Sequence, residues 1–184
     1  MACLRPVLIL ALLMALSTAL VQAGDSDKDW VPVQIKEVLL VDSTPAVLLL
    51  DSPGQRYLLI FIDYFMAGSI RMGMHGPPLE RPLTHDLIGI FLKRLGARIT
   101  RISITGLKDN TYYALISLQV NGEVAEIDAR PSDAMALAVR SQVPIFADAH
   151  LLKTLRNQPG LPLPEDERPA PGTPETSPEQ RGKT

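Results

Sequence analysis

The sequence predicts an α+β fold: a mixed, mostly antiparallel sheet built from two β-β-β-α repeats, with helices packed on it. Three observations lead to this prediction. Apolar runs of strand length occur in two groups of three, and a segment with helical spacing follows each group. The turns within the groups are short and carry Ser-Pro-Gly at 52–54, Asp-Asn at 109–110 and Asn-Gly at 121–122. Turns of this chemistry join neighbouring strands as hairpins, so most strand pairs should be antiparallel.

The first repeat opens with three candidate strands. Residues 31–41 begin with alternating apolar and polar side chains and become fully apolar, as in a strand that enters the buried part of a sheet. The apolar runs 46–50 and 57–62 flank the Ser-Pro-Gly turn and are expected to form a hairpin. Residues 64–74 are a weaker helix candidate, which the Gly-Pro-Pro run at 76–78 would end.

A clearer amphipathic helix is expected from Thr84 to Leu95. Gly96 supplies the stop that often follows a helix. The apolar residues at helical spacing are Leu87, Ile88, Phe91, Leu92 and Leu95.

The second half of the chain repeats this plan. We expect strands at 99–107, 111–120 and 123–128, a helix at 131–141, a short extended piece at 143–146 and a last helix at 147–156. The two halves look like an internal duplication, and chance similarity of two good helix starts is the alternative.

Residues 1–23 have the features of a secretory signal peptide. Arg5 precedes an unbroken apolar run from Val7 to Val21, and Val-Gln-Ala at 21–23 is a small-residue exit. The run is shorter than the ~18 to 20 residues that a membrane-spanning helix needs. A retained membrane anchor is the alternative. We expect an exported chain, periplasmic or secreted, with no stable membrane span after cleavage.

The rest of the chain divides into three parts. Residues 24–29 form a short acidic lead, 30–156 the folded domain, and 157–184 a proline-rich tail that cannot bury enough apolar surface to order itself. Cys3 is the only cysteine and precedes the cleavage site, so disulfides and cysteine-zinc sites are not expected in the mature chain. A net charge of −2 gives the chain no long-range field that would gather nucleic acid.

The densest polar cluster lies where the strand at 123–128 meets the next helix. It holds Asp128, Arg130, Ser132 and Asp133. Arg130 could clamp an anion such as phosphate, while Asp128 and Asp133 could hold Mg²⁺ or Mn²⁺ or orient a water. The structural alternative is that Ser132 or Asp133 caps the helix and Arg130 pairs with Asp128.

A second cluster lies at the start of the helix at 84–95. Arg81 precedes it, and His85 and Asp86 fall in its first turn. An imidazole there could act as a general acid or base. His and Asp are also ordinary residues in a first helical turn, so a structural role is the alternative.

Both segments resemble the bifunctional nuclease family, whose hallmarks are Arg-Pro-Leu-Thr-His-Asp-Leu and Asp-Ala-Arg-Pro-Ser-Asp-Ala. Both stretches stand complete here, at 81–87 and 128–134. The resemblance implies a compact domain with nuclease activity towards DNA and RNA, assembled as a homo-oligomer. Residue patterns and resemblance together give an expected site with catalytic residues Asp128, Asp133, His85 and Asp86, substrate-binding residues Arg81, Arg130 and Ser132, and Asp128 and Asp133 as ligands of a divalent metal, Mg²⁺ or Mn²⁺.

One segment departs from the family. Where its pattern has glycine, two variable residues and glutamate at the start of a helix, this chain has Asp63 and Met66. Methionine neither coordinates a hard cation nor transfers a proton. Two functions are therefore open: a metal-assisted nuclease in which metal-activated water attacks phosphorus, and a catalytically silent module that binds an anionic ligand or partner. A purely structural oligomer is a third.

Overall fold

The structure is a computed structural model that describes residues 28–77 and 79–155. The predicted signal peptide, most of the acidic lead and the predicted tail lie outside this range. The strands are β1 (Trp30–Val41), β2 (Thr44–Asp51), β3 (Arg56–Phe61), β4 (Ala97–Lys108), β5 (Thr111–Val120), β6 (Glu123–Ala129), β7 (Ile145–Asp148) and β8 (Lys153–Thr154). The helices are α2 (Tyr64–His75), α3 (Thr84–Arg94), α4 (Pro131–Ser141) and the short 3-10 turn η1 (Ala149–Leu151).

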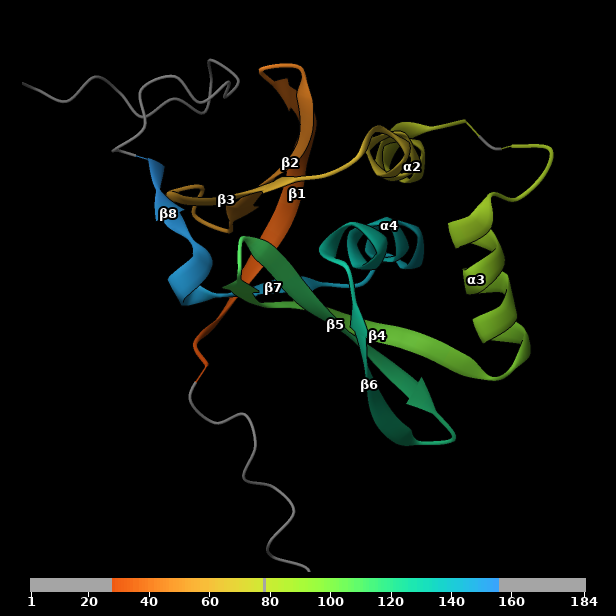
Figure 1. Ribbon diagram of the computed structural model, residues 1–184. Coiled ribbons are helices and arrows are strands. Elements are labelled where there is room, and N and C mark those ends of the chain that lie inside the picture. The colour runs from red at the N-terminus through yellow and green to blue at the C-terminus, as the bar shows by residue number, and fades with distance from the viewer. Residues whose placement is uncertain (1–27, 78, 156–184) are drawn as a thin grey trace, which may run out of the picture.

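The strands form one twisted sheet in the order β6-β5-β4-β7-β1-β2-β3-β8 (Figure 1). Each repeat is an antiparallel meander, β1-β2-β3 or β4-β5-β6. Strand β7 lies between the two meanders, antiparallel to β1 and parallel to β4. The structure therefore confirms the predicted α+β class and its mixed, mostly antiparallel sheet.

Residues with positive φ make the tight turns of the second meander, β4-β5-β6. Asp109 and Asn110 have φ of 48° and 59°, and Asn121 and Gly122 have φ of 52° and 89°. Two consecutive left-handed residues match the right-handed twist of the strands that they join, and Asn, Asp and Gly adopt that conformation most easily. Turn chemistry thus brings β4, β5 and β6 into register.

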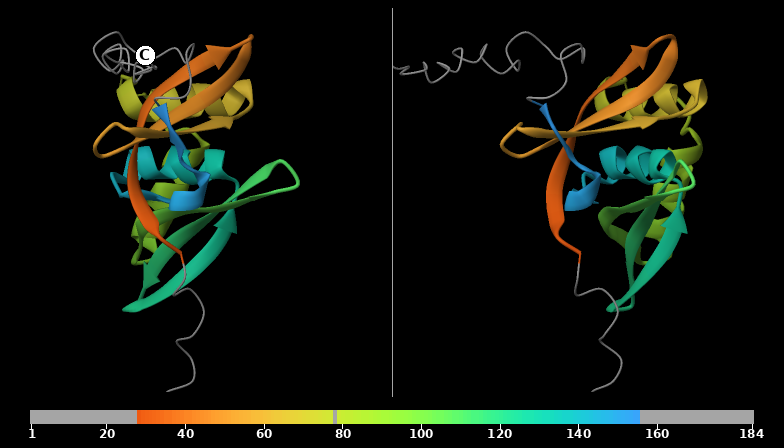
Figure 2. Two further views of the ribbon diagram at one scale, coloured as in Figure 1. Left: turned by 90° about the vertical axis from the view of Figure 1, so that its left-hand side faces the viewer. Right: turned by 60° about the vertical axis from the view of Figure 1, so that its left-hand side comes forward.

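The three α-helices lie on one side of the sheet, as Figure 2 shows from two directions. Helix α4 is central and packs against α2, α3, β4 and β5. Its Met135 and the β4 residues Ile102 and Ile104 are fully buried in the main hydrophobic core, together with Ile70 of α2. The side chains that α4 does not bury in this core are the ones available for a site.

Helix α3 exposes much of its expected apolar face. Only Ile88 and Leu92 pack against the core, whereas Leu87, Phe91 and Leu95 are 38%, 60% and 75% exposed. The helix contacts the rest of the domain along a narrow side, through α4 and β4. The result is an exposed apolar strip on α3.

The prediction of a helix at 147–156 is wrong. Ala147 and Asp148 belong to β7, where they pair with β1, and only η1 and β8 follow. The Asp148 carboxylate accepts hydrogen bonds from the backbone N–H and the Nδ1 of His150, each at 3.0 Å, so the chain turns after the strand. Pairing with a strand far away in sequence prevailed over local helical preference. Within the described residues, no helix has the length and apolar character needed to cross a membrane.

Candidate functional site

A cavity of about 570 Å³ opens between α2, the start of α3 and the first turns of α4. Its lining residues come from segments far apart in the sequence: Phe65, Met66, Gly68, Ser69 and Met72 from α2, Leu83, Thr84, His85 and Ile88 from the α3 region, and Asp133 and Leu137 from α4. One wall is polar and the remainder is largely apolar.

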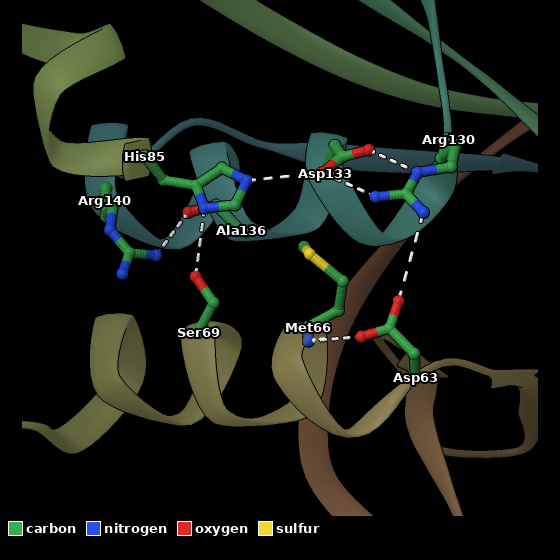
Figure 3. Close-up of polar contacts among 8 residues, drawn as sticks. All are labelled: Asp63, Met66, Ser69, His85, Arg130, Asp133, Ala136 and Arg140. Carbon is green, nitrogen blue, oxygen red and sulfur yellow. Dashed lines mark hydrogen bonds and ion pairs between the residues drawn. The ribbon is translucent and has the colours of Figure 1, made fainter. Parts of the chain in front are cut away.

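His85 provides the centre of the polar wall. Helix α3 begins with the Leu83 N–H donating to Asp86 Oδ2 at 2.8 Å. His85 lies in the first turn of this helix and is only 8% exposed. Its Nδ1 lies 3.0 Å from Ser69 Oγ, and its Nε2 lies 3.4 Å from Asp133 Oδ1 (Figure 3). An ionised carboxylate only accepts, so in the neutral form of the ring Nε2 carries the proton and Nδ1 accepts from the Ser69 hydroxyl. The basic nitrogen of His85 therefore faces Ser69.

Arg130 extends this row of contacts. Its Nε donates to Asp133 Oδ2 at 2.7 Å, and its Nη1 lies 3.9 Å from Asp63 Oδ2. Burial alone would raise the pKa of Asp133, but the hydrogen bond and positive charge of Arg130, with a smaller contribution from His85, hold that pKa below its usual value. Asp133 is thus kept as a carboxylate between an imidazole and a guanidinium. The Arg130 side chain is 66% exposed and remains accessible to an anion.

Met66 lines the same cavity as His85 and Asp133 and is 7% exposed. Its N–H donates at 2.8 Å to the Asp63 carboxylate, which caps the start of α2. The position at which the family resemblance expects a glutamate therefore lies beside the His85–Asp133 pair and carries an apolar side chain. Asp63 lies outside the cavity lining and reaches the site only through Arg130.

Asp86 and Arg81 line a smaller neighbouring cavity of about 320 Å³. Asp86 Oδ1 accepts from Arg140 Nε at 2.6 Å. Burial would raise the pKa of Asp86, but the Leu83 N–H and the Arg140 guanidinium outweigh it and lower that pKa. Asp86 therefore has a structural role: it caps the start of α3 and links α3 to α4 through Arg140.

The remaining expected residues are not brought to the cavity. Asp128 is exposed on β6, an edge strand of the sheet, where it pairs with Leu115. Ser132 is 7% exposed and does not line the cavity. Arg130 pairs with Asp133 and not, as the structural alternative had it, with Asp128. Arg130 itself occupies the N-cap position of α4, without a side-chain capping bond.

The donor set of the site does not favour a metal ion held by protein ligands alone. Asp133 and Asp63 face Arg130, and no group of three or more His, Cys, Asp or Glu side chains gathers within residues 28–77 and 79–155. Metal dependence stays a prediction.

Sequence reasoning missed Ser69, Arg140 and Phe65. Ser69 follows Met66 by three residues, so a helix over 64–74 places both on one face. In the same way, Arg140 lies two turns after Asp133 on the predicted helix at 131–141. The helical period was the signal available for both. Phe65 had no such signal.

Known proteins share sequence similarity with most of the described domain. The profile of the bifunctional nuclease domain matches residues 47–159. An uncharacterized protein of Mycobacterium tuberculosis, present in strains H37Rv and CDC 1551, is 36% identical over 122 residues, which cover 66% of this chain and 70% of that protein. Bifunctional nuclease 1 of Arabidopsis thaliana is 28% identical over 111 residues, which cover 58% of this chain but 34% of the plant protein. The chain belongs to the bifunctional nuclease domain family.

Proposed function

We propose that this protein hydrolyses phosphodiester bonds in nucleic acid at the cavity between α2, α3 and α4. Family membership supports the reaction class. The observation that carries the proposal is the single row of contacts in which His85 lies between Ser69 and Asp133, with Arg130 on the far side of Asp133. A base, the group that orients it and a cation for phosphate thus lie together.

Each residue has a distinct task in the proposed reaction. Arg130 binds the phosphate through the guanidinium N–H groups that Asp133 does not hold, because its exposed side chain can reach phosphate oxygens. Asp133 keeps the His85 ring in one tautomer and stabilises the imidazolium that forms when the ring accepts a proton. Ser69 links the basic Nδ1 to the cavity, so that a water bound there passes its proton through the Ser69 hydroxyl to His85 as its oxygen bonds to phosphorus. The P–O bond to the leaving nucleoside oxygen breaks, and that oxygen takes up a proton from the His85 imidazolium or from water.

The second candidate function is a binding module that does not cleave. Met66 favours it, because the cavity lacks a carboxylate at the position where the family pattern has one. The Met66→Glu variant distinguishes the two functions. If the parent binds nucleic acid without cutting it and Met66→Glu cuts it, the binding module is correct.

Cleavage assays test the proposal directly. The purified protein is incubated with single- and double-stranded DNA and RNA, with Mg²⁺ or Mn²⁺ and separately with a chelator. We expect cleavage by the parent and a loss of about tenfold or more in kcat/KM for Asp133→Asn, because the neutral amide no longer stabilises the imidazolium. Asp109→Asn, in the exposed β4–β5 turn, is the matched control and should behave as the parent. Equal rates for the parent and Asp133→Asn would refute the site, and the chelator arm tests metal dependence.

We also propose that copies of the chain associate through α3. Leu87, Ile90, Phe91 and Leu95 leave an apolar strip on this helix, and contiguous apolar surface of this kind commonly marks an interface. Phe91→Glu would place a charge within it. We expect the parent to sediment as an oligomer and Phe91→Glu as a smaller species with unchanged circular dichroism. A parent that sediments as a monomer at high concentration would rule out this interface.

A further inference from the structure

We propose that the apolar part of the cavity holds a nucleobase, stacked against Phe65, so that the substrate is single-stranded nucleic acid. This inference rests on the proposed function and adds the substrate class. It concerns the apolar lining of the cavity, which adjoins the polar side chains assigned to phosphate.

The apolar wall is built from Met66, Met72, Ile88 and Leu137. A phosphodiester group would not bind favourably to such a surface, because the anion would lose hydration there without gaining a hydrogen-bond donor. The adjoining His85, Asp133 and Arg130 are polar. A ligand that satisfies both walls carries an anionic group beside a flat apolar one, as every nucleotide does. The cavity volume of about 570 Å³ also falls within the ordinary range of small-molecule sites.

Phe65 is the residue best placed to recognise the base. It lies in the first turn of α2, lines the cavity and is 90% exposed, the highest exposure among the large apolar residues of the described chain. Its neighbour Tyr64 is also exposed, but the Tyr64 hydroxyl donates to the Ser43 carbonyl and so has a structural partner. Phe65 offers an open ring face at the rim of the cavity. Aromatic faces of this kind stack on any base, so binding of this type does not depend on nucleotide sequence.

Charge and strand pairing both favour this reading. With a net charge of −2, the chain cannot rely on general attraction to phosphates, so stacking has to supply much of the affinity. In a duplex each base is already paired and stacked, and taking one out costs free energy. An unpaired strand enters the cavity without that cost. Single strands should therefore bind better than duplexes.

The test measures binding separately from cleavage. Fluorescence anisotropy gives the Kd of a labelled single-stranded DNA for the parent, Phe65→Ala and Phe65→Trp, in the presence of chelator. Phe61→Ala is the matched control, since Phe61 is 54% exposed on β3 and does not line the cavity. We expect Phe65→Ala to raise Kd by about tenfold or more, Phe65→Trp to keep affinity near that of the parent, and Phe61→Ala to have no effect. A duplex of the same sequence, and a single strand made entirely of abasic nucleotides, should both bind more weakly to the parent.

Failure of this inference is distinguishable from failure of the proposed function. Single-strand binding that depends on Phe65, without any cleavage, would support the base site and refute the nuclease. Cleavage by the parent with a Kd and KM unaffected by Phe65→Ala and by loss of the bases would refute the base site alone. If Phe65→Ala instead dissociates an oligomer and leaves DNA affinity unchanged, the apolar wall is covered by a second copy and the inference is wrong.

Discussion

Replacing His85 with alanine is expected to lower kcat/KM for nucleic-acid cleavage by about 10²- to 10⁴-fold, the usual contribution of a positioned general base. The reason is geometric. His85 is the one imidazole in the described part of the chain that lines the cavity, and its two nitrogens contact Ser69 and Asp133. Single-turnover cleavage of a labelled oligonucleotide measures the effect, because it reports the chemical step without product release.

His150 provides an internal control for this result. It also forms a pair with a carboxylate, at 3.0 Å from Asp148, but its side chain is 84% exposed and lies outside the cavity. His150→Ala should keep the activity of the parent. Because His85 is buried, His85→Gln provides a second variant that retains polar contacts, and thermal unfolding of both variants separates a loss of fold from a loss of base. A folded His85→Gln protein with full activity would show that the base lies elsewhere.

The largest expected effect on stability comes from Gly73→Val. Gly73 lies where α2 packs tightly against α4, and a Cβ at this position would be 2.5 Å from Val139 Cγ2 and 2.8 Å from Arg140 Nη1. Valine side chains in helices have little rotational freedom, so α2 and α4 would have to move apart. We expect a loss of about 3 kcal/mol in the free energy of unfolding, near the upper end of values for overpacked contacts. Urea unfolding measures it.

Gly68 in the same helix allows a matched comparison. A Cβ there meets nothing within 4 Å, so Gly68→Val makes the same chemical change in open space. Its effect should be close to zero or slightly stabilising, because valine favours a helix more than glycine does. Equal stability of Gly73→Val and Gly68→Val would contradict the tight α2–α4 packing described at Gly73.

Local chemistry was sufficient to predict most of the sheet. The Asp109-Asn110 and Asn121-Gly122 turns adopt the positive φ values that two-residue hairpins need, and Gly96, with φ of 70°, ends α3 where the sequence predicted. These features depend on one or two residues and their own conformational preferences. They could be predicted because no distant part of the chain decides them.

Pairing between distant segments could not be predicted in the same way. Strand β7 lies between β1 and β4 because Ile145 meets both Val33 and Ile102. Nothing within residues 143–156 indicates those partners, so the local pattern suggested a helix instead.

Export is a different case, since it rests only on residues 1–23, which lie outside the described range, and stays a prediction.

The candidate site shows the same division. His85 and Asp133 were expected as site residues, each at a helix start, but their contact joins residues 48 positions apart and follows only from the packing of α3 on α4. Asp128, by contrast, stands five residues before Asp133 but lies exposed on β6, outside the cavity lining, because the chain leaves an edge strand and enters a helix between them. Closeness in sequence was therefore a poor guide to which carboxylate accompanies Arg130.

One measurement tests the central claim most directly: a crystal structure of the His85→Ala protein with a short single-stranded oligonucleotide. The substitution should slow cleavage enough for the strand to remain intact during crystallisation. We predict a backbone phosphate within hydrogen-bond distance of Arg130, the cavity beside Asp133 occupied by the strand, and one base against Phe65. An ordered strand bound on another face of the domain, with the cavity free of nucleic acid, would contradict the account.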